Sequence, residues 1–294
     1  MNSVRFFASL RFLVAVACFG RTGSAFAASW VTYDPRSAAP LTPKFIRTKV
    51  QLSPPTHHLI QNVWLTRANL WITRQDTDTV EKYALDGALI KRFDVRGDVA
   101  AIAAADDGSF CIADDDSGRL DFYSATGTLQ HAVVVGTQPS SIVRDSQGNL
   151  WVSCYGDLDG NGADARIMEL SSSGEVLHTL PLSVRPDAIC VSPQGAIDVL
   201  ANTTRSICTV SRDGKVLRTF QMSEQARAFF VDARHHVWVA PFASDAIKEL
   251  DADGRVLDVY EAGFEPVSFF GTRAGTIYVA ASWKNAVFYF KPAR

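Results

Sequence analysis

The stretch NLWVSCYGDLDGNGADARIMELSSSG, residues 149–174, contains the units from which most of the chain is built. A strand-like run, NLWVSCY, leads into an Asp/Gly-rich loop, and a second strand-like run, ARIMELS, leads into the turn SSSG. The two runs and the turn recur along the chain, whereas the Asp/Gly-rich loop occurs once. The recurring parts therefore concern the architecture, and the loop is a candidate for a site.

The recurrence is regular, with a period of about 40 residues, which is typical of propeller and solenoid repeats. Successive turn glycines are equally spaced except across one longer interval, and the centres of the strands before them follow the same rule. The longer interval includes the Asp/Gly-rich loop in both series, so chance is a poor explanation. The glycines are Gly87, Gly127, Gly174, Gly214 and Gly254, and the strand centres are Trp71, Cys111, Trp151, Asp198, Trp238 and Tyr278.

Each unit contains short runs rich in Val, Ile, Leu and aromatic residues, separated by turn residues, which is typical of β-strands. Four short strands in each repeat of this length are the signature of a β-propeller blade. Residues 57–291 contain five complete units and a sixth with three strands. The run FIRTKVQL, residues 45–52, can supply the missing outermost strand. We therefore expect an all-β, six-bladed β-propeller whose ring is closed by this N-terminal strand.

The segment 1–27 has the pattern of a secretory signal peptide. Two arginines precede the apolar run FLVAVACF, and small residues end in the cleavage pattern AFA at 25–27. The run is too short to span a bilayer, so we expect no transmembrane helix in the mature chain. A linker at 28–44 would precede the propeller at 45–294. We expect a secreted or periplasmic protein. The alternative, a lipoprotein anchored through Cys18, lacks the usual Leu three positions before the cysteine.

Composition and cysteine spacing exclude several classes of partner and cross-link. The net charge of −2 gives no reason to expect nucleic acid. No G-x-S-x-G elbow occurs, so nothing indicates a serine nucleophile of that type. No phosphate-cradling glycine motif occurs, and we expect no organic cofactor. We also expect a monomer. Cys190 and Cys208 fall on non-adjacent strands of one blade, too far apart for a disulfide. With Cys111 and Cys154, they are expected to be free and buried.

A ring of polar side chains is expected at one end of the central channel. The residue before each first strand is polar or ionisable in all six units, and two charged residues follow close behind in units four and five. Such residues can converge near the channel mouth and bind a polar ligand, although loop ends at a solvated rim are polar in any case. The set is His58, Asp98, Gln138, Arg185, Asp187, Gln225, Arg227 and Glu265, with Asp187 and Arg227 as a candidate acid–base pair.

The Asp/Gly-rich loop fits the first half of a calcium-binding pattern. Asp157, Asp159 and Asn161 alternate before a glycine, so their oxygens can face one ion, and Asp164 can add another. The twelfth position is Met168 where an EF-hand has Glu, and no flanking helices are expected. The two alternatives are a calcium loop carried on a propeller and a plain solvated turn.

The repeats resemble those of six-bladed propellers of the NHL-repeat and SMP-30/gluconolactonase type, and of streptogramin lyases. The resemblance covers residues 57–291. It rests on DSQGNLWVSCYGD at 145–157, ARIMELSSSGEVLHTL at 165–180 and RPDAICVSPQG at 185–195. It implies a propeller fold and, in the enzymes of this type, a divalent metal at the channel mouth.

The metal ligands of these enzymes carry over only in part. SMP-30-like lactonases use Glu, Asn and Asp, but the corresponding strand starts here are Val99-Ala100, Pro139-Ser140 and Pro186-Asp187, and His58-Leu59 stands where the Glu is found. Streptogramin lyases carry an acidic residue at the end of second strands. The matching positions here are Arg74, Asp114, Cys154, Ala201, Pro241 and Ala281. A rearranged metal site would draw on Asp187, Asp98, Glu265 or His58.

We therefore expect a propeller that binds a small-molecule or protein ligand at the channel rim without the metal chemistry of the family. The alternative is a metal-dependent lactonase, esterase or C–O lyase that uses Ca²⁺ or another divalent metal.

The Asp/Gly-rich loop makes a direct prediction. Calcium should raise the melting temperature of the mature protein, since an ion bound only by the folded loop at about 100 times its Kd adds about 2.7 kcal/mol. Asp157→Ala combined with Asp159→Ala should erase this rise. Differential scanning fluorimetry with and without Ca²⁺ measures it, and an equal rise in the double variant would contradict the calcium site.

Overall fold

The computed structural model describes residues 45–56, 58–75, 77–156, 164–192, 195–242, 244–272 and 276–292. The expected signal peptide, Cys18 and the linker lie outside these residues. Of the predicted calcium loop, Asp157, Asp159 and Asn161 also lie outside them, and only Asp164 is described.

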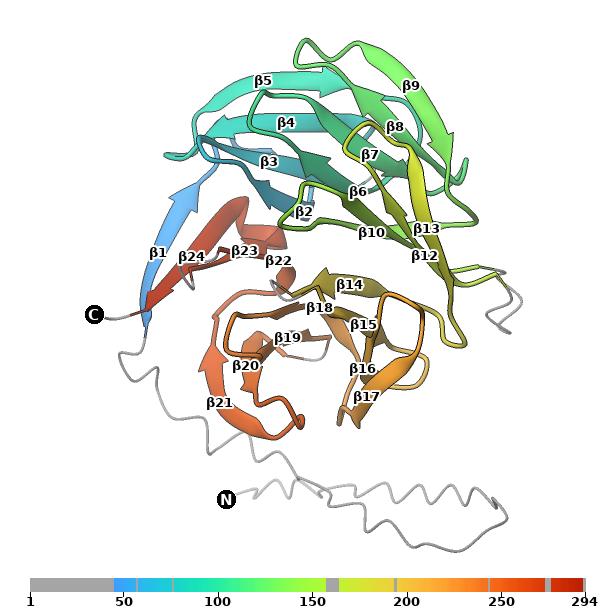
Figure 1. The fold of residues 1–294 in the computed structure, drawn as a ribbon. Coiled ribbons are helices and arrows are strands. Elements are labelled where there is room, and N and C mark those ends of the chain that lie inside the picture. Colours follow the sequence, from blue (N-terminus) through green and yellow to red (C-terminus); the bar gives the residue numbers. More distant parts are fainter. Residues whose placement is uncertain are drawn as a thin grey trace, which may run out of the picture. The chain divides into compact units, whose positions relative to one another are not determined.

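The described strands form six four-stranded antiparallel sheets, and each sheet is one blade (Figure 1). Blade 1 contains β2 Ile60–Leu65, β3 Asn69–Arg74, β4 Thr79–Ala84 and β5 Leu89–Asp94, and blade 2 contains β6 Val99–Ala104, β7 Phe110–Asp114, β8 Arg119–Tyr123 and β9 Leu129–Val134. Blade 3 contains β10 Pro139–Arg144, β11 Leu150–Cys154, β12 Arg166–Leu170 and β13 Val176–Pro181, and blade 4 contains β14 Ala188–Val191, β15 Ile197–Ala201, β16 Ser206–Val210 and β17 Val216–Gln221. Blade 5 contains β18 Ala226–Val231, β19 Val237–Pro241, β20 Ala246–Leu250 and β21 Val256–Glu261, and blade 6 contains β22 Pro266–Gly271, β23 Ile277–Ala281, β24 Ala286–Pro292 and β1 Phe45–Gln51.

Burial falls from the second strand of each blade to the outermost strand. The second strands β7, β11, β15 and β19 are buried along their whole length, because a neighbouring blade packs on each face of the sheet. The outermost strands β9, β13, β17 and β21 bury at most one residue each. Second strands therefore have continuous apolar sequences such as LWVSC, and outermost strands carry charged and polar residues.

The ring closes as the sequence predicted. The innermost strands β2, β6, β10, β14, β18 and β22 contact one another in that order, and β22 contacts β2. β1 pairs antiparallel with β24, with Val50 opposite Val287. The Arg47 guanidinium lies 4.9 Å from the centre of the Phe288 ring and donates to the carbonyl oxygen of Ala262 at 2.8 Å. The N-terminal strand thus forms the outer edge of the last blade.

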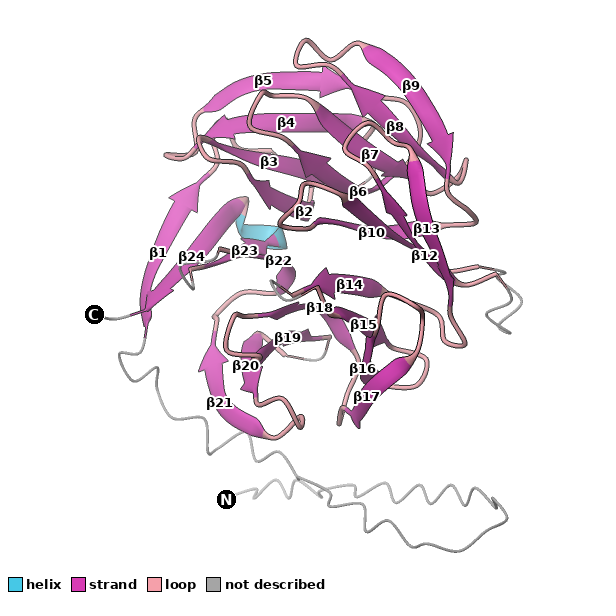
Figure 2. Ribbon diagram, viewed as in Figure 1, coloured by secondary structure: helices cyan, strands magenta, loops and turns pink. Residues whose placement is uncertain are grey.

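Strands and connecting loops dominate the fold (Figure 2), and the described residues include one short helical turn. This turn, η2, is a 3₁₀ helix at Ser282–Lys284 between β23 and β24. It ends at Asn285, which has a left-handed backbone conformation with φ of 46°. The described residues include no helix with the length and apolar character needed to cross a membrane.

The four cysteines of the propeller are free and buried, as predicted. Burial raises the pKa of Cys111, Cys154 and Cys190 to about 12 and also raises the pKa of Cys208. These thiols therefore stay protonated at neutral pH and behave as small apolar residues.

We expect Val50→Asp to destabilise the propeller by about 3 kcal/mol or more. The change places an unpaired charge at the seam between the two ends of the chain, where Val50 is only 7% exposed. Lys49→Asp is the matched control, since Lys49 is the exposed neighbour on the same strand and its replacement should cost less than about 0.5 kcal/mol. Urea unfolding measures both variants, and equal stabilities would show that β1 does not close the ring.

Candidate functional site at the channel mouth

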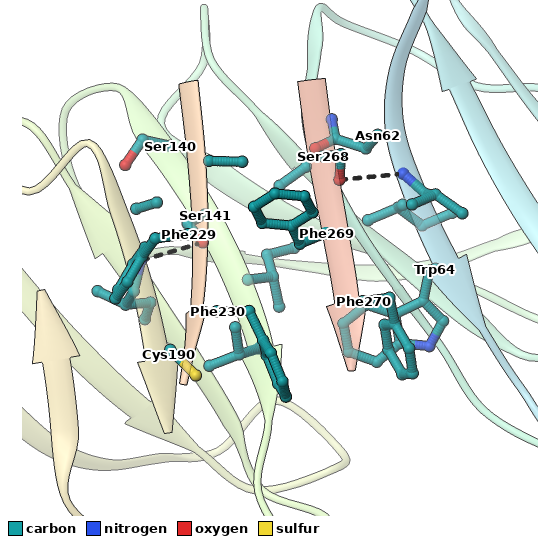
Figure 3. Close-up of a pocket in the computed structure, with 18 of the residues that line it drawn as sticks. Asn62, Trp64, Ser140, Ser141, Cys190, Phe229, Phe230, Ser268, Phe269 and Phe270 are labelled. Carbon is teal, nitrogen blue, oxygen red and sulfur yellow. Dashed lines mark hydrogen bonds between the residues drawn. The ribbon is translucent and has the colours of Figure 1, made fainter. Parts of the chain in front are cut away.

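A cavity of about 260 Å³ is lined by the innermost strands of all six blades. We call the end at which these strands begin the mouth. Polar side chains such as Asn62 and Ser140 lie toward one end of the cavity, and the aromatic rings of Trp64, Phe230 and Phe270 lie toward the other (Figure 3). Because Asn62 and Ser140 lie near the start of their strands, the polar end is the mouth.

The polar side chains within the channel tie neighbouring blades together. The Asn62 amide donates to the carbonyl oxygen of Ala100 in the next blade at 2.8 Å. The Ser140 hydroxyl donates to the carbonyl oxygen of Pro186, just before the first strand of the next blade, at 2.9 Å. These groups are committed to the ring, so the loops at the mouth are the main source of groups for a ligand.

One backbone hydrogen bond recurs at the mouth in four blades. The residue after the second strand donates its N–H to the carbonyl oxygen of the residue just before the first strand, over 2.9–3.1 Å. This bond sets two series of side chains next to each other around the mouth. The donor–acceptor pairs are Gln75 to Leu59, Asp115 to Asp98, Tyr155 to Gln138 and Phe242 to Gln225.

The predicted rim residues all lie in or just before the innermost strands, but their surroundings differ. Three are exposed, namely His58, Asp98 and Gln225. The other five are half-buried, namely Gln138, Arg185, Asp187, Arg227 and Glu265. The half-buried group contains both arginines and two carboxylates, so it is the part of the ring that can hold a ligand out of bulk water.

Two arginines at the mouth are each stacked on an aromatic ring. The Arg185 guanidinium lies 3.9 Å from the centre of the Tyr155 ring, and that of Arg227 lies 4.7 Å from the centre of the Phe242 ring. Within the described residues, the Nε atoms of both arginines are buried without a hydrogen-bond partner. Stacking leaves the N–H donors at the edge of a guanidinium available for a planar anion, and Arg185 has no ion pair among the described residues that would use them.

Glu265 forms a cluster with Arg227 and Trp283. Its carboxylate pairs with the Arg227 guanidinium and accepts a hydrogen bond from the indole N–H of Trp283. Trp283 is 72% exposed and Phe242 is 47% exposed, so this side of the mouth presents aromatic surface to solvent. The sequence suggested Asp187 as the partner of Arg227, and in the structure the ion pair is formed with Glu265.

In blade 4 the side chain of Asp187 takes the place of the backbone carbonyl oxygen in the recurring hydrogen bond. Its Oδ2 accepts the backbone N–H of Asn202 at 2.7 Å, where the four blades above use a carbonyl oxygen. Burial raises the pKa of Asp187, while the Asn202 N–H and the charge of Arg185 act in the opposite direction. Asp187 also lines the channel, so this carboxylate both holds the loop and faces the cavity.

The sequence analysis missed Tyr155, Phe242 and Trp283. Tyr155 and Phe242 occupy the same place in the repeat, one position beyond Cys154 and Pro241 at the ends of their second strands. The repeat register could have found these two, because the loops after second strands belong to the same rim as the loops before first strands. Trp283 lies in the helical turn, and the described residues include no other helical turn.

The resemblance implies a metal site, and its candidate ligands can be placed in the structure. Across the described ranges, no three or more His, Cys, Asp or Glu side chains are close enough together to hold a metal ion. Among the candidates for a rearranged site, Glu265 is engaged by Arg227 and Trp283, and Asp187 by Asn202.

Asp187→Asn should make the protein more stable at neutral pH. The folded-state pKa of Asp187 is raised, so its stabilising contribution is present at low pH and is lost as pH rises through that pKa. Asn carries no charge to desolvate, and its oxygen can still accept the N–H of Asn202. The advantage of the variant should therefore disappear near pH 3, below the usual pKa of Asp of about 3.9.

Urea unfolding at pH 7 and pH 3 measures this difference. Asp213→Asn is a control for which we expect the opposite change in stability. The Ser211 hydroxyl lowers the pKa of Asp213, so the Asp213 carboxylate stabilises the folded protein at neutral pH and its replacement should be destabilising there. A less stable Asp187→Asn variant at pH 7 would contradict the prediction.

Comparison with known proteins agrees with this architecture. The family model described as SMP-30/Gluconolactonase/LRE-like region matches residues 63–282. No curated protein matches the sequence.

Solved structures share the fold at low sequence identity. A gluconolactonase from Xanthomonas campestris superposes with a TM-score of 0.67 at 13% identity, covering 89% of this chain and 94% of that one. A virginiamycin B lyase from Staphylococcus aureus gives a TM-score of 0.62 at 11% identity, covering 85% of this chain and 100% of that one. At such identities the likeness concerns the fold alone. With the family match over residues 63–282 and six blades closed into a ring, this chain belongs to the SMP-30/gluconolactonase/LRE-like family.

Proposed function

We propose that the protein is a secreted or periplasmic binding protein that holds a small hydroxylated organic acid at the channel mouth, without the metal chemistry of its family. The observation that carries this proposal is the pair of arginines, Arg185 and Arg227. Each is stacked on an aromatic ring, and each has a buried Nε without a partner in the described residues.

The arginines provide the anion-binding part of the site. Arg185 forms no ion pair among the described residues, and its position on Tyr155 orients its guanidinium before a ligand arrives. A planar guanidinium can bind a carboxylate through two parallel hydrogen bonds, each stronger than a bond between neutral groups. A half-buried position strengthens the interaction, since fewer waters compete for the donors.

The remaining groups at the mouth suit hydroxyl groups on the ligand. Asp187 supplies a carboxylate oxygen, Oδ1, besides the one that accepts from Asn202. The amide of Gln225 donates to the carbonyl oxygen of Asn202 at 3.3 Å, which leaves the side-chain oxygen of Gln225 as a further acceptor. Hydroxyl groups donate well to such oxygens. Phe242 adds an apolar wall. An acid with several hydroxyl groups therefore matches the charge and the acceptors together.

Family membership favours the competing function, a metal-dependent lactonase or lyase. Asp187 is the observation on its side, because it faces the channel at a position where the family carries a metal ligand. Against it stand the hydrogen bond from Asn202 to Asp187 and the engagement of Glu265 by Arg227 and Trp283. Calcium at Asp157, Asp159, Asn161 and Asp164 would have a structural role in either case.

Titration of the mature protein with D-gluconate and with the uncharged analogue D-glucitol tests the proposal. We expect gluconate to bind and glucitol to bind at least tenfold more weakly, since each charge-assisted hydrogen bond contributes about 1.5–3 kcal/mol. Arg185→Gln combined with Arg227→Gln should weaken gluconate binding roughly a hundredfold. Arg255→Gln, which alters an exposed charge in the turn before β21, is the matched control and should change nothing.

Two results would overturn the proposal. One is equal gluconate affinity in the double variant and the wild type, or the absence of any binding. The other is hydrolysis of glucono-δ-lactone that stops with a chelator and returns with a divalent metal, which would establish the enzyme instead.

A further inference from the structure

A second cavity lies at the end of the channel opposite the mouth. It is an open hollow with a volume of about 420 Å³. We call it the basal cavity. It is formed where innermost strands end, by residues that include Trp64 and Arg67 of blade 1, Asp106 of blade 2, Arg144 and Asp145 of blade 3, and Phe270 of blade 6.

Three side chains form the boundary between the two cavities. Trp64, Arg144 and Phe270 line both the channel and the basal cavity. Figure 3 shows Trp64 and Phe270 together at the aromatic end of the channel. A ligand in the basal cavity would therefore meet aromatic rings and an arginine, and the mouth would stay free for another molecule.

The aromatic wall of the basal cavity is held in place before any ligand binds. The rings of Trp64 and Phe270 meet edge to face, with centres 5.2 Å apart and an interplanar angle of 66°. The indole N–H of Trp64 donates to the carbonyl oxygen of Ala104 at 3.0 Å. Beside Phe270, the missing side chain of Gly271 makes room for Phe230, because a Cβ at this position would overlap the Phe230 ring. Such packing leaves little freedom for the wall to collapse.

Arg144 gives the basal cavity a half-buried positive charge. Its Nη1 donates to the carbonyl oxygen of Gly148 at 3.2 Å, and its Nε is buried without a partner in the described part of the chain. No ion pair of Arg144 is formed among those residues. A half-buried guanidinium that has no ion pair and an unpartnered Nε can still donate hydrogen bonds to an anion.

The neighbouring carboxylates already have other partners. Asp145 accepts the indole N–H of Trp151 at 3.1 Å and the backbone N–H of Asn149 at 3.0 Å. Asp106 accepts the backbone N–H of Arg67 at 2.8 Å and lies 3.9 Å from its guanidinium. Arg67 is 89% exposed, so it adds positive charge at the rim and not inside the cavity.

From these observations we propose that the basal cavity binds a small aromatic carboxylate. The ring of the ligand packs against Trp64 and Phe270, and its carboxylate accepts hydrogen bonds from Arg144. Both parts are needed, because a single arginine holds a small anion weakly in water and the aromatic wall alone does not select for charge. This site is independent of the proposed function at the mouth.

Isothermal titration calorimetry with benzoate, benzamide and acetate tests the proposal. Benzoate should bind the mature protein, while benzamide, which lacks the charge, and acetate, which lacks the ring, should each bind at least tenfold more weakly. Arg144→Gln should weaken benzoate binding roughly tenfold or more, and Arg144→Lys, which keeps the charge, should lose less. Phe270→Leu should weaken benzoate binding and leave the response to acetate unchanged.

The controls separate this site from the mouth. Arg185→Gln combined with Arg227→Gln should leave benzoate binding intact, as should Arg255→Gln, and a thermal melt shows that each variant is folded. The proposal is overturned if millimolar benzoate gives no binding, if Arg144→Gln and Arg144→Lys both bind it as the wild type does, or if the loss occurs in the double variant of the mouth.

Discussion

The pairing of β1 with β24 is the interaction on which the rest of the structure depends. The six innermost strands contact their neighbours around the ring, so the channel exists only while the ring is closed. β1 joins the beginning of the described chain to its end by backbone hydrogen bonds, and it places Arg47 over Phe288 and Val50 in the core. In an open ring, the first and last blades would each expose one face with its apolar second strand. Closing the ring buries both faces.

Within the closed ring, a recurring backbone hydrogen bond fixes the loops of the mouth. It links the residue after a second strand to the residue before a first strand in blades 1, 2, 3 and 5. Because this bond uses only backbone atoms, the side chains at both positions are free to vary, which is how one fold can serve many functions. Blade 4 departs from the rule, since the Asp187 carboxylate accepts the N–H of Asn202. This side-chain bond of blade 4 lies next to Arg185, in the charged part of the mouth.

Buried carboxylates elsewhere in the propeller have several partners each. Glu81 accepts from Arg74, Tyr83 and Arg92, and although burial raises the pKa of its carboxyl, these bonds together lower it. Glu249 is similarly engaged by Tyr260, His236 and Arg234.

Arg185 at the mouth and Arg144 at the opposite end differ from these groups, because they form no ion pair in the described residues. Burying a charge is costly unless it is paired, so a half-buried arginine without an ion pair is a candidate for binding an anionic ligand.

The sequence by itself determined the number of blades, the antiparallel four-stranded unit and the closing role of residues 45–52. Each repeat carries strand-forming and turn-forming residues at the same positions. These local preferences agree with the packing of the blades, so they could be read from the sequence. It also located the polar positions from His58 to Glu265, because the repeat carries them in phase. The free, buried state of the cysteines followed from the same register.

Only the tertiary structure decided which of these residues act together. The pairing of Arg227 with Glu265, and not with Asp187, depends on side-chain reach across blades, which no spacing along the chain reveals. The stacking of Arg185 on Tyr155, and the meeting of Trp64, Arg144 and Phe270 at the end of the channel, join residues from different blades. The period of the repeat predicts where a residue lies within its blade. It does not predict the contacts between blades, because these depend on how different side chains pack against one another around the ring.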